Sequence, residues 1–211
     1  MRELPGNDRT VWQRRAKRLF DVAGSATALV LLSPLLASVA LLIVASDGRP
    51  ILYRWRVVGR GGIPFTSWKF RTMVRDADAR KSELLGLNEM SGPVFKIRED
   101  PRITPLGRFL RRFSLDELPQ LWSVLKGDMS LVGPRPPLVK EYDQFSEWQK
   151  QKLSVIPGIT CLWQVSGRNE ITDFDDWVRM DLQYIQEWSL VEDFKIMLRT
   201  VGAVFRRRGA Y

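Results

Sequence analysis

The sequence has 211 residues, a formal net charge of +9 and no histidine. Its length suits one sizeable domain rather than two. The positive charge predicts an anionic partner, which could be nucleic acid, an acidic membrane surface or a phosphorylated substrate. A single cysteine, Cys161, excludes an intrachain disulfide and a multi-cysteine zinc site. The lack of histidine excludes Ser-His and Cys-His nucleophilic pairs, which leaves proton transfer to carboxylates, lysine or tyrosine.

An uncharged, apolar stretch covers residues 22–46. As a helix it would be about 37 Å long at about 1.5 Å per residue, which is enough to cross a bilayer. The pair Ser33-Pro34 in its middle predicts a kink, because proline lacks a backbone N–H and clashes with the preceding turn. Basic residues flank the stretch on both sides: Arg14, Arg15, Lys17 and Arg18 before it, and Arg49, Arg54, Arg56 and Arg60 after it.

The two basic flanks favour a helix that enters the membrane, bends at Ser33-Pro34 and returns to the same face. Positive residues prefer the cytosolic side, and only this arrangement keeps both flanks there. A straight single-pass helix that tolerates the proline is the commoner arrangement, and it stays open from the residues alone. A cleaved signal peptide is disfavoured, because the apolar run is long and begins late.

Two short strands are predicted at residues 51–58 and 65–72, with a glycine-rich connection at 59–64. We interpret the connection as a hairpin loop, and a phosphate cradle is the alternative. In the second strand Lys69 and Arg71 alternate with aromatic residues, so one face is cationic. Residues 73–90 suit a polar helix or a mobile lid, and a further short strand is predicted at 94–97.

An adjacent carboxylate pair, Asp116 and Glu117, lies between two predicted helices. Residues 106–113 have apolar side chains at helical spacing with arginines between them, and a second helix is predicted from about residue 118 to Gly127. Its start is ambiguous, because Ser114 to Glu117 fits a capping box whereas Asp116 as the N-cap better accommodates Pro119. Both alternatives put the carboxylates at a helix N-terminus. Taken alone, ordinary capping would explain them.

The second half of the chain predicts a helix at residues 138–148, a strand at 159–165, and two further helices. Cys161 falls in the strand and is expected to be an inert core residue. The acidic residues at 173–176 lack calcium-loop spacing, so we interpret them as the start of a helix. An apolar stripe at residues 194–205 suits either a membrane interface or a core contact.

The residues around Asp116 suggest phosphate chemistry. One carboxylate can attack or position a phosphate group, and its neighbour can hold a divalent cation. Arginines can neutralise phosphoryl oxygens. The turn Gly133-Pro134-Arg135-Pro136 supplies one such arginine in a rigid segment.

With these motifs in hand, the chain resembles the bacterial sugar transferase family, the monotopic polyprenyl-phosphate phosphoglycosyltransferases. The match covers nearly the whole chain and follows the family order. Its elements are Ser33-Pro34, residues 69–73 (Lys-Phe-Arg-Thr-Met), 92–97 (Gly-Pro-Val-Phe-Lys-Ile), 100–102 (Asp-Pro-Arg), 114–120 (Ser-Leu-Asp-Glu-Leu-Pro-Gln), 133–136 (Gly-Pro-Arg-Pro) and 157–160 (Pro-Gly-Ile-Thr).

The resemblance implies transfer of a sugar 1-phosphate from a nucleotide diphosphate sugar to polyprenyl (undecaprenyl) phosphate, with release of a nucleoside monophosphate. Asp116 matches the nucleophile that forms a covalent phosphosugar intermediate, and Glu117 matches the partner that helps to hold Mg²⁺. Arg111 and Arg135 match phosphate-contacting arginines, and Lys69 is a helper. The family's re-entrant helix carries over to Ser33 and Pro34.

The implied fold is α+β, mostly helical with short strands. Residues 1–48 would form the basic N-terminus and re-entrant membrane helix, and residues 49–211 a cytosolic catalytic domain with an amphipathic C-terminal segment. The implied location is the bacterial inner membrane, where the product would start polysaccharide assembly. Longer family members carry further membrane helices and a domain ahead of the catalytic part, and we expect none here.

The stretch at residues 88–93 resembles the catalytic portion of undecaprenyl-phosphate hexose-1-phosphate transferases, which favours uridine diphosphate (UDP) glucose or galactose as donor. The expected partners are this donor, polyprenyl phosphate and membrane lipid, with no nucleic acid. The choice between monomer and homo-oligomer is left open. Two alternatives remain: a direct glycosyltransferase that releases UDP, and a basic membrane-anchored scaffold or nucleic-acid binder without catalysis.

Overall fold

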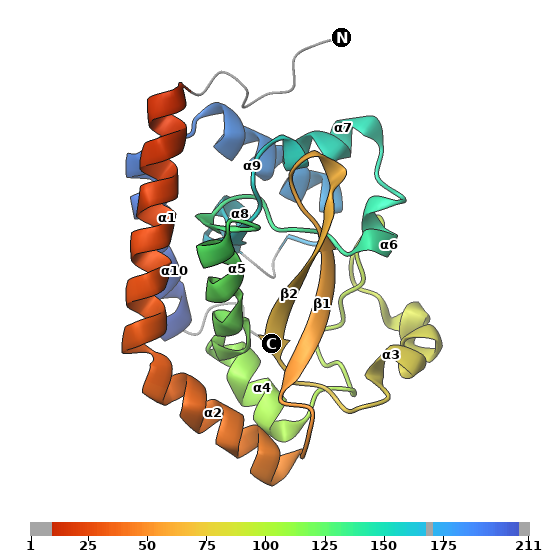
Figure 1. Cartoon of the computed structure of the whole chain (residues 1–211). Helices are drawn as coiled ribbons and strands as arrows, with labels where there is room; N and C mark the ends of the chain where they lie inside the picture. The colour runs from red at the N-terminus through yellow and green to blue at the C-terminus, as the bar shows by residue number, and fades with distance from the viewer. Residues whose placement is uncertain (1–9, 168–170, 207–211) are drawn as a thin grey trace.

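The computed structural model describes residues 10–167 and 171–206, which form a mainly helical α+β fold (Figure 1). The longer helices are α1 (Val11–Leu31), α2 (Ser33–Ser46), α9 (Phe174–Gln186) and α10 (Leu190–Arg206). The shorter ones are α3 (Ala77–Arg80), α4 (Pro105–Arg112), α5 (Leu121–Lys126), α6 (Val139–Tyr142), α7 (Glu147–Lys150) and α8 (Leu162–Val165). Four 3-10 helices are η1 (Arg60–Gly62), η2 (Lys81–Leu87), η3 (Leu115–Gln120) and η4 (Gln151–Ser154) within the described ranges.

The strands in this part of the chain form two small sheets. β1 (Leu52–Val58) and β2 (Pro64–Phe70) are antiparallel and pair from Leu52 with Phe70 to Val58 with Pro64. β3 (Ser130–Val132) and β4 (Gly158–Thr160) are parallel. The predicted hairpin is therefore confirmed, with η1 at its turn.

The N-terminal helices α1 and α2 are bent by 60° relative to each other. α2 begins at Ser33 with Pro34 in its first turn, where a missing N–H breaks no helical hydrogen bond. The Ser33 hydroxyl donates to the Val30 carbonyl over 2.8 Å. The predicted break at Ser33 and Pro34 is confirmed. Among the described helices none is long and apolar enough to cross a membrane alone, whereas this bent pair meets that requirement together.

One face of α2 packs on the rest of the described fold. Val39 and Ile43 are buried against Phe70 of β2 and Leu110 of α4. Away from this contact, large apolar side chains on both N-terminal helices are more than half exposed: Val30, Leu31, Leu41 and Leu42.

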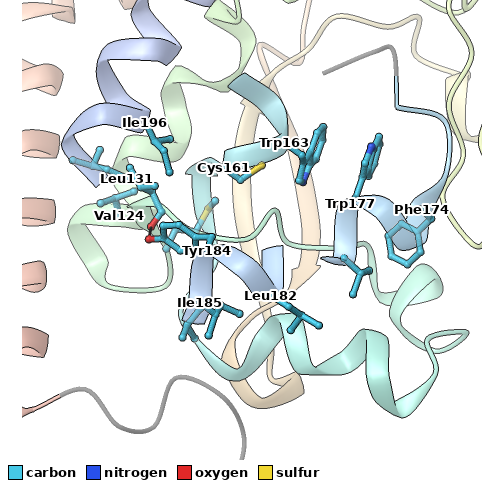
Figure 2. Packing of buried hydrophobic residues seen from close by; sticks show 14 of the residues in the cluster. Val124, Leu131, Cys161, Trp163, Phe174, Trp177, Leu182, Tyr184, Ile185 and Ile196 are labelled. Atoms are coloured by element: carbon cyan, nitrogen blue, oxygen red, sulfur yellow. Dashed lines mark hydrogen bonds between the residues drawn. The ribbon is translucent and has the colours of Figure 1, made fainter. Parts of the chain in front are cut away.

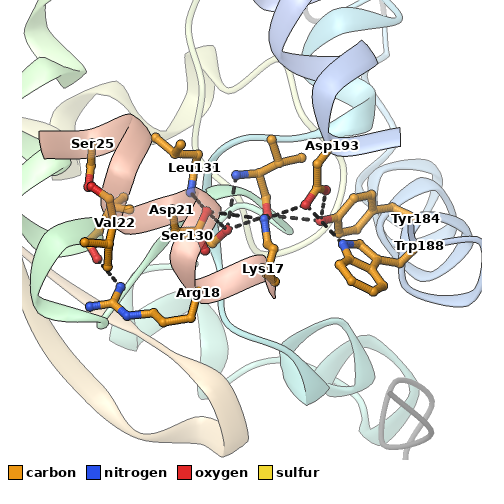
Figure 3. A network of polar contacts seen from close by, with 12 residues as sticks. Lys17, Arg18, Asp21, Val22, Ser25, Ser130, Leu131, Tyr184, Trp188 and Asp193 are labelled. Atoms are coloured by element: carbon orange, nitrogen blue, oxygen red, sulfur yellow. Dashed lines mark hydrogen bonds and ion pairs between the residues drawn. The ribbon is translucent and has the colours of Figure 1, made fainter. Parts of the chain in front are cut away.

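A buried cation attaches α1 to the body (Figure 3). Lys17 Nζ lies 2.7 Å from Asp193 Oδ2 of α10 and 3.4 Å from Asp21 Oδ1, one turn further along α1. It also donates to the Val132 carbonyl of β3 over 3.1 Å. Further donors reach the two carboxylates, namely Ser130 Oγ and the Leu131 N–H to Asp21, and Tyr184 Oη and Trp188 Nε1 to Asp193. We call these residues the Lys17 network.

The next residue, Arg18, caps α5. Its Nη1 donates to the Val124 carbonyl over 2.6 Å and its Nη2 to the Leu125 carbonyl over 2.7 Å. The last carbonyls of a helix have no partner within the helix, so an arginine satisfies them well. The predicted stop at Gly127 is confirmed, with φ at 99°. Lys17 and Arg18, which the sequence assigned to the basic flank of a membrane helix, therefore bind the protein itself.

The main hydrophobic core lies between α5, β3, α8, α9 and α10 (Figure 2). Trp163 of α8 and Trp177 of α9 stack with ring centroids 4.0 Å apart and nearly parallel planes. Cys161 is buried there as predicted, and burial raises the pKa of its thiol. The start of α9 is also as predicted, because Asp173 is its N-cap and accepts from the Asp175 N–H over 2.9 Å.

The predicted strand at residues 94–97 and the predicted single helix at 138–148 are wrong. Residues 94–97 have no regular secondary structure. Residues 138–148 contain α6 and then α7, because Ser146 starts a new helix: its Oγ accepts from the Gln149 N–H over 3.3 Å, and its own N–H donates to Gln149 Oε1 over 2.9 Å.

The predicted strand at 159–165 is correct only at its beginning. β4 ends at Thr160, and α8 follows. A short apolar run does not distinguish a strand from a buried helical turn, which explains the error. The region 73–90 contains α3 and η2, so its helical interpretation is confirmed for most of residues 77–87.

Replacing Lys17 with methionine should destabilise the folded protein strongly. Removing one partner of a buried ion pair costs about 3–5 kcal/mol, because the remaining charge is buried without compensation. We expect a decrease of about this size in the free energy of unfolding of Lys17→Met, measured by denaturant titration in detergent micelles with tryptophan fluorescence.

Lys195→Met is the matched control. Lys195 forms an exposed ion pair with Glu192, the residue that precedes Asp193 on α10. Loss of this ion pair should change the free energy of unfolding by no more than about 0.5 kcal/mol. Equal effects of the two substitutions would contradict the role given to the Lys17 network.

Candidate functional site

A cavity of about 710 Å³ lies between the β1–β2 hairpin, η3 and residues 94–102. Its wall contains the five residues that were predicted as catalytic or phosphate-binding, and these come from β2, α4, η3 and the turn after β3: Lys69, Arg111, Asp116, Glu117 and Arg135. Ser33 and Pro34, predicted as the helix break, do not line it. We call this the cationic cavity.

The 3-10 helix η3 holds both carboxylates. Asp116 and Glu117 lie in its first turn, and each is 8% exposed. Of the two predicted alternatives, Asp116 as the N-cap is wrong, whereas Ser114 does take the N-cap position but without the side-chain bond of a capping box. The segment is a 3-10 helix up to Gln120, with Pro119 inside it, and α5 begins only at Leu121.

Ser114 itself has a strained backbone. Its φ is 53°, a positive value that no other non-glycine residue has within the described ranges. Such a conformation is unfavourable for a residue with a Cβ and is retained where the surroundings enforce it. Here it provides the sharp turn that leads from α4 directly into the carboxylate pair.

Two cations hold Glu117. Lys69 Nζ lies 2.7 Å from Glu117 Oε1, and Arg135 Nη2 lies 3.0 Å from the same oxygen. The ring of Trp55, on β1, is 3.7 Å from Lys69 Nζ, which adds a cation–π contact. Glu117 therefore orients two cations on the cavity wall.

A close backbone contact places Arg135 at the cavity. Gly133 and Gly158 meet where β3 and β4 run side by side, and a Cβ on Gly158 would lie only 2.1 Å from Gly133 N. Glycine alone permits this approach. The rigid turn that begins at Gly133 therefore leaves β3 at a fixed point and carries Arg135 to Glu117.

Arg111 is fixed by a similar approach of α4 to the end of β2. A Cβ on Gly107 would lie 2.0 Å from the Thr72 carbonyl oxygen, so α4 can pack this closely only with glycine at that position. Thr104 caps the helix by accepting the Gly107 N–H over 2.9 Å. Arg111 Nε then donates to Thr72 Oγ1 over 2.8 Å.

Burial and charge shift the pKa values of the cavity cations. Burial lowers the pKa of Lys69, with Arg135 acting in the same direction and Glu117 against it. Burial also lowers the pKa of Arg111, although Asp116 opposes this. Burial acts on Arg135 as well, but the attraction of Glu117 outweighs it and the pKa of Arg135 is raised. Asp116 attracts all three cations, which places its carboxylate within their electrostatic field.

Arg71 is a cavity residue that was not among the predicted site residues. It is 6% exposed, and its Nη2 donates to the carbonyls of Asp47 and Gly48, each over 2.7 Å. Its Nε and Nη1 have no hydrogen-bond partner in the described part of the chain. Buried donors without partners are rare and unfavourable, so we interpret them as ready to bind an anion. The alternation of Lys69 and Arg71 along β2 was the sequence signal for this role.

The carboxylates of Asp116 and Glu117 fit a magnesium ion. Mg²⁺ is usually bound by one or two carboxylates together with substrate phosphates and water. A cluster of three or more His, Cys, Asp or Glu side chains that could hold a metal without substrate does not occur in the described ranges. Asp100, which also lines the cavity, is paired with Arg102 through two hydrogen bonds of 2.9 and 2.6 Å.

The family model described as "Bacterial sugar transferase" matches residues 12–207. The chain is 49% identical over 195 residues to "Galactosyl transferase CpsE" of Streptococcus agalactiae, which covers 92% of this chain and 43% of that protein. It is 44% identical over 202 residues to "Undecaprenyl-phosphate galactose phosphotransferase" of Salmonella typhimurium, which covers 94% of this chain and 42% of that protein. It is 41% identical over 200 residues to "Exopolysaccharide production protein ExoY" of Rhizobium meliloti, which covers 93% of this chain and 88% of that protein. The chain thus spans less than half of the first two relatives and most of the third.

Because the pKa of Lys69 is lowered, its positive charge should be lost at a lower pH than that of an ordinary lysine. We expect the affinity for inorganic pyrophosphate to fall as the pH rises through this pKa. Lys69→Arg keeps its charge over the range and should move the fall to higher pH. Isothermal titration calorimetry from about pH 7 to about pH 10 measures this. The ionisation of pyrophosphate itself over this pH range affects the measurements on both proteins equally. Superimposable profiles of affinity against pH would therefore refute the role of Lys69.

Arg71→Met should weaken pyrophosphate binding about 10- to 100-fold, the loss expected for hydrogen bonds to a charged group. Arg56→Met, which removes an exposed arginine of β1 outside the cavity wall, is the control and should leave the affinity unchanged. Unfolding of both variants is measured in parallel, since Arg71 also binds two carbonyls. An Arg71→Met protein that is folded and binds pyrophosphate normally would exclude the anion-binding role.

Proposed function

Because the chain belongs to the bacterial sugar transferase family and is a transferase, we propose that it transfers a sugar 1-phosphate from a nucleotide diphosphate sugar to polyprenyl phosphate. A nucleoside monophosphate would be released, and the lipid-linked sugar would begin polysaccharide assembly. The name of the Salmonella relative supports the lipid acceptor and the transfer of phosphate with the sugar, and the name of the Rhizobium relative supports a place in exopolysaccharide production.

The observation that carries this proposal is a buried carboxylate, Asp116, in the field of Lys69, Arg111 and Arg135. An ionised carboxylate needs no base to attack phosphorus, so the absence of histidine is no obstacle. A carboxylate oxygen of Asp116 would attack the phosphorus that carries the sugar. The bond from this phosphorus to the bridging oxygen would break, and the nucleoside monophosphate would leave with its electron pair.

The second half of the reaction restores the enzyme. An oxygen of the polyprenyl phosphate would attack the same phosphorus, and the bond to Asp116 would break to regenerate the carboxylate. The product is then a polyprenyl diphosphosugar. The attacking group is an anion in both steps, the Asp116 carboxylate in the first and a phosphate oxygen of the acceptor in the second. Neither step therefore requires a strong general base.

Repulsion between anions is the main barrier that the protein must reduce. Arg111 and Arg135 are fixed by their contacts before a substrate binds, so they can stabilise charge on the transferred phosphoryl group without reorganising. Lys69 and Arg71 extend the same positive wall. Glu117 would help to hold a magnesium ion, whose charge would offset that of the diphosphate oxygens.

The bent helix pair supports a re-entrant membrane anchor at the cytosolic face of the bacterial inner membrane. Its outward apolar side chains suit lipid, and the bend lets both ends of the pair return to one face. The anchor would hold the cationic cavity at the height of the lipid phosphate. As donor we propose UDP-galactose or UDP-glucose, and the galactose in the names of two relatives supports the first.

Asp116→Asn should abolish release of the nucleoside monophosphate while the protein stays folded, because the amide is a far weaker nucleophile than the carboxylate. In the unsubstituted protein, incubation with donor, magnesium and no acceptor should add the mass of a hexose phosphate to the peptide that contains Asp116. Mass spectrometry of rapidly quenched samples measures this adduct, and it should be missing in Asp116→Asn.

The nucleotide that is released distinguishes this proposal from its alternatives. Uridine monophosphate is expected, whereas uridine diphosphate would indicate direct glycosyl transfer. Wild-type turnover in Asp116→Asn would exclude this residue as the nucleophile. Tight, salt-dependent binding of nucleic acid without any turnover would favour a non-catalytic basic protein.

A further inference from the structure

A second cavity, of about 160 Å³, adjoins the cationic one and lies between η3, α8 and the C-terminal part of α10. Glu117 and Gln164 line both cavities. The remaining wall is largely apolar and includes Leu118, Leu121, Ile159, Val165, Ala203 and Val204. We call this the apolar cavity.

Polar side chains in the apolar cavity already have partners within the protein. Thr160 Oγ1 and Thr200 Oγ1 are hydrogen-bonded to each other at 2.7 Å, and Gln164 Oε1 accepts from Cys161 Sγ at 3.2 Å. A polar ligand would lose its hydrogen bonds with water here and gain few in return, which is unfavourable. The wall therefore selects an apolar group.

The volume limits the size of that group. An apolar protein cavity of about 150 Å³ holds one benzene molecule. One isoprene unit has fewer carbon atoms than benzene, so it fits a space of this size. A long hydrocarbon chain does not fit and must continue outside.

Glu117 joins this apolar space to the phosphate chemistry of the cationic cavity. A ligand that occupies both must be anionic at one end and apolar immediately behind the anion. Of the two proposed substrates, only polyprenyl phosphate has that form. We propose that the apolar cavity binds the isoprene unit next to the phosphate of the acceptor, an inference that rests on the proposed function.

The outer face of α10 offers a path for the remaining chain. Leu198 and Val201 are 58% and 56% exposed, and they lie on the same helix as Ala203 and Val204 of the cavity wall. The acceptor chain would leave the apolar cavity along this face. The donor, which is polar throughout, would use only the cationic cavity, so the two substrates approach Asp116 and Glu117 from different sides.

Ala203→Phe tests this inference by filling the apolar cavity. Gly202→Phe is the control, because it puts the same side chain on the adjacent residue of α10, where an added Cβ meets no atom within 4 Å. We expect Ala203→Phe to raise the KM for polyprenyl phosphate about tenfold or more, which corresponds to about two methylene groups no longer buried. Gly202→Phe should leave this KM unchanged.

The donor half-reaction is measured separately. Exchange of labelled nucleoside monophosphate into the nucleotide diphosphate sugar needs no acceptor, so it should proceed normally in both variants. Absence of this exchange in the unsubstituted protein would refute the proposed function. Normal exchange together with an unchanged KM in Ala203→Phe would refute only the role of the apolar cavity.

A labelling experiment covers the case in which Ala203→Phe is misfolded. Polyprenyl phosphate with a photoreactive diazirine on its first isoprene unit is irradiated with the unsubstituted protein, and the labelled peptides are identified by mass spectrometry. Label on η3 or on residues 200–204, competed by unlabelled polyprenyl phosphate, supports the proposal. Label confined to the exposed faces of α2 and α4 overturns it.

Discussion

The rest of the structure depends on a buried lysine in the segment that the sequence presents as the basic flank of a membrane helix. Lys17 is only 9% exposed, and it binds α10, β3 and its own helix at once. Charges of this kind are stable in a protein interior only when they are paired and fully hydrogen-bonded. The donors that surround Asp21 and Asp193 meet this requirement. The position of α1 is therefore specified by directional contacts, which apolar packing alone would not provide.

This attachment also connects the N-terminal helix pair with the cationic cavity. Lys17 donates to the carbonyl of Val132, the last residue of β3, and Tyr184 Oη lies 3.0 Å from the same carbonyl oxygen. The next residue, Gly133, begins the turn that carries Arg135 to Glu117. On the other side, Arg71, which lines the cationic cavity, donates to the carbonyls of Asp47 and Gly48 just after α2. The helix pair is thus linked to cavity cations at two points: α1 binds Val132, three residues before Arg135, and the residues just after α2 bind Arg71 directly.

The balance of opposite charges holds the side chains of the cationic cavity in place. Lys69 and Arg135 would repel each other without Glu117, and Glu117 would be a poor residue to bury without them. A substrate phosphate can take over part of the attraction that Glu117 provides, so the cavity is prepared for an anion before one binds. Asp116 lies in the same field.

Much of this organisation was predictable from local sequence. The break at Ser33-Pro34, the β1–β2 hairpin and the stop at Gly127 each follow from a proline, an alternation or a glycine acting over a few residues. Bringing Lys69, Arg111 and Arg135 into one cavity with Asp116 depended on the family resemblance, because nothing local links segments so distant in sequence. The errors share a cause. Pro119 and Ser146 changed the helices around them in ways that apolar spacing does not reveal, and the unpaired donors of Arg71 are visible only once its surroundings are known.

The position of Lys17 also has a consequence for how the chain is assembled. Its partner carbonyl in β3 is 115 residues further along the chain, so α1 is synthesised well before the body that will neutralise its charges. In the proposed membrane anchor, the charged side chains of Lys17 and Asp21 would resist entry into hydrocarbon until then, which would keep the first turns of α1 at the aqueous interface. Contacts so far apart in sequence form slowly. With the re-entrant anchor proposed above, a nascent chain would insert the apolar part of the α1–α2 pair first, and the catalytic body would then fold onto the first turns of α1 and neutralise their charges.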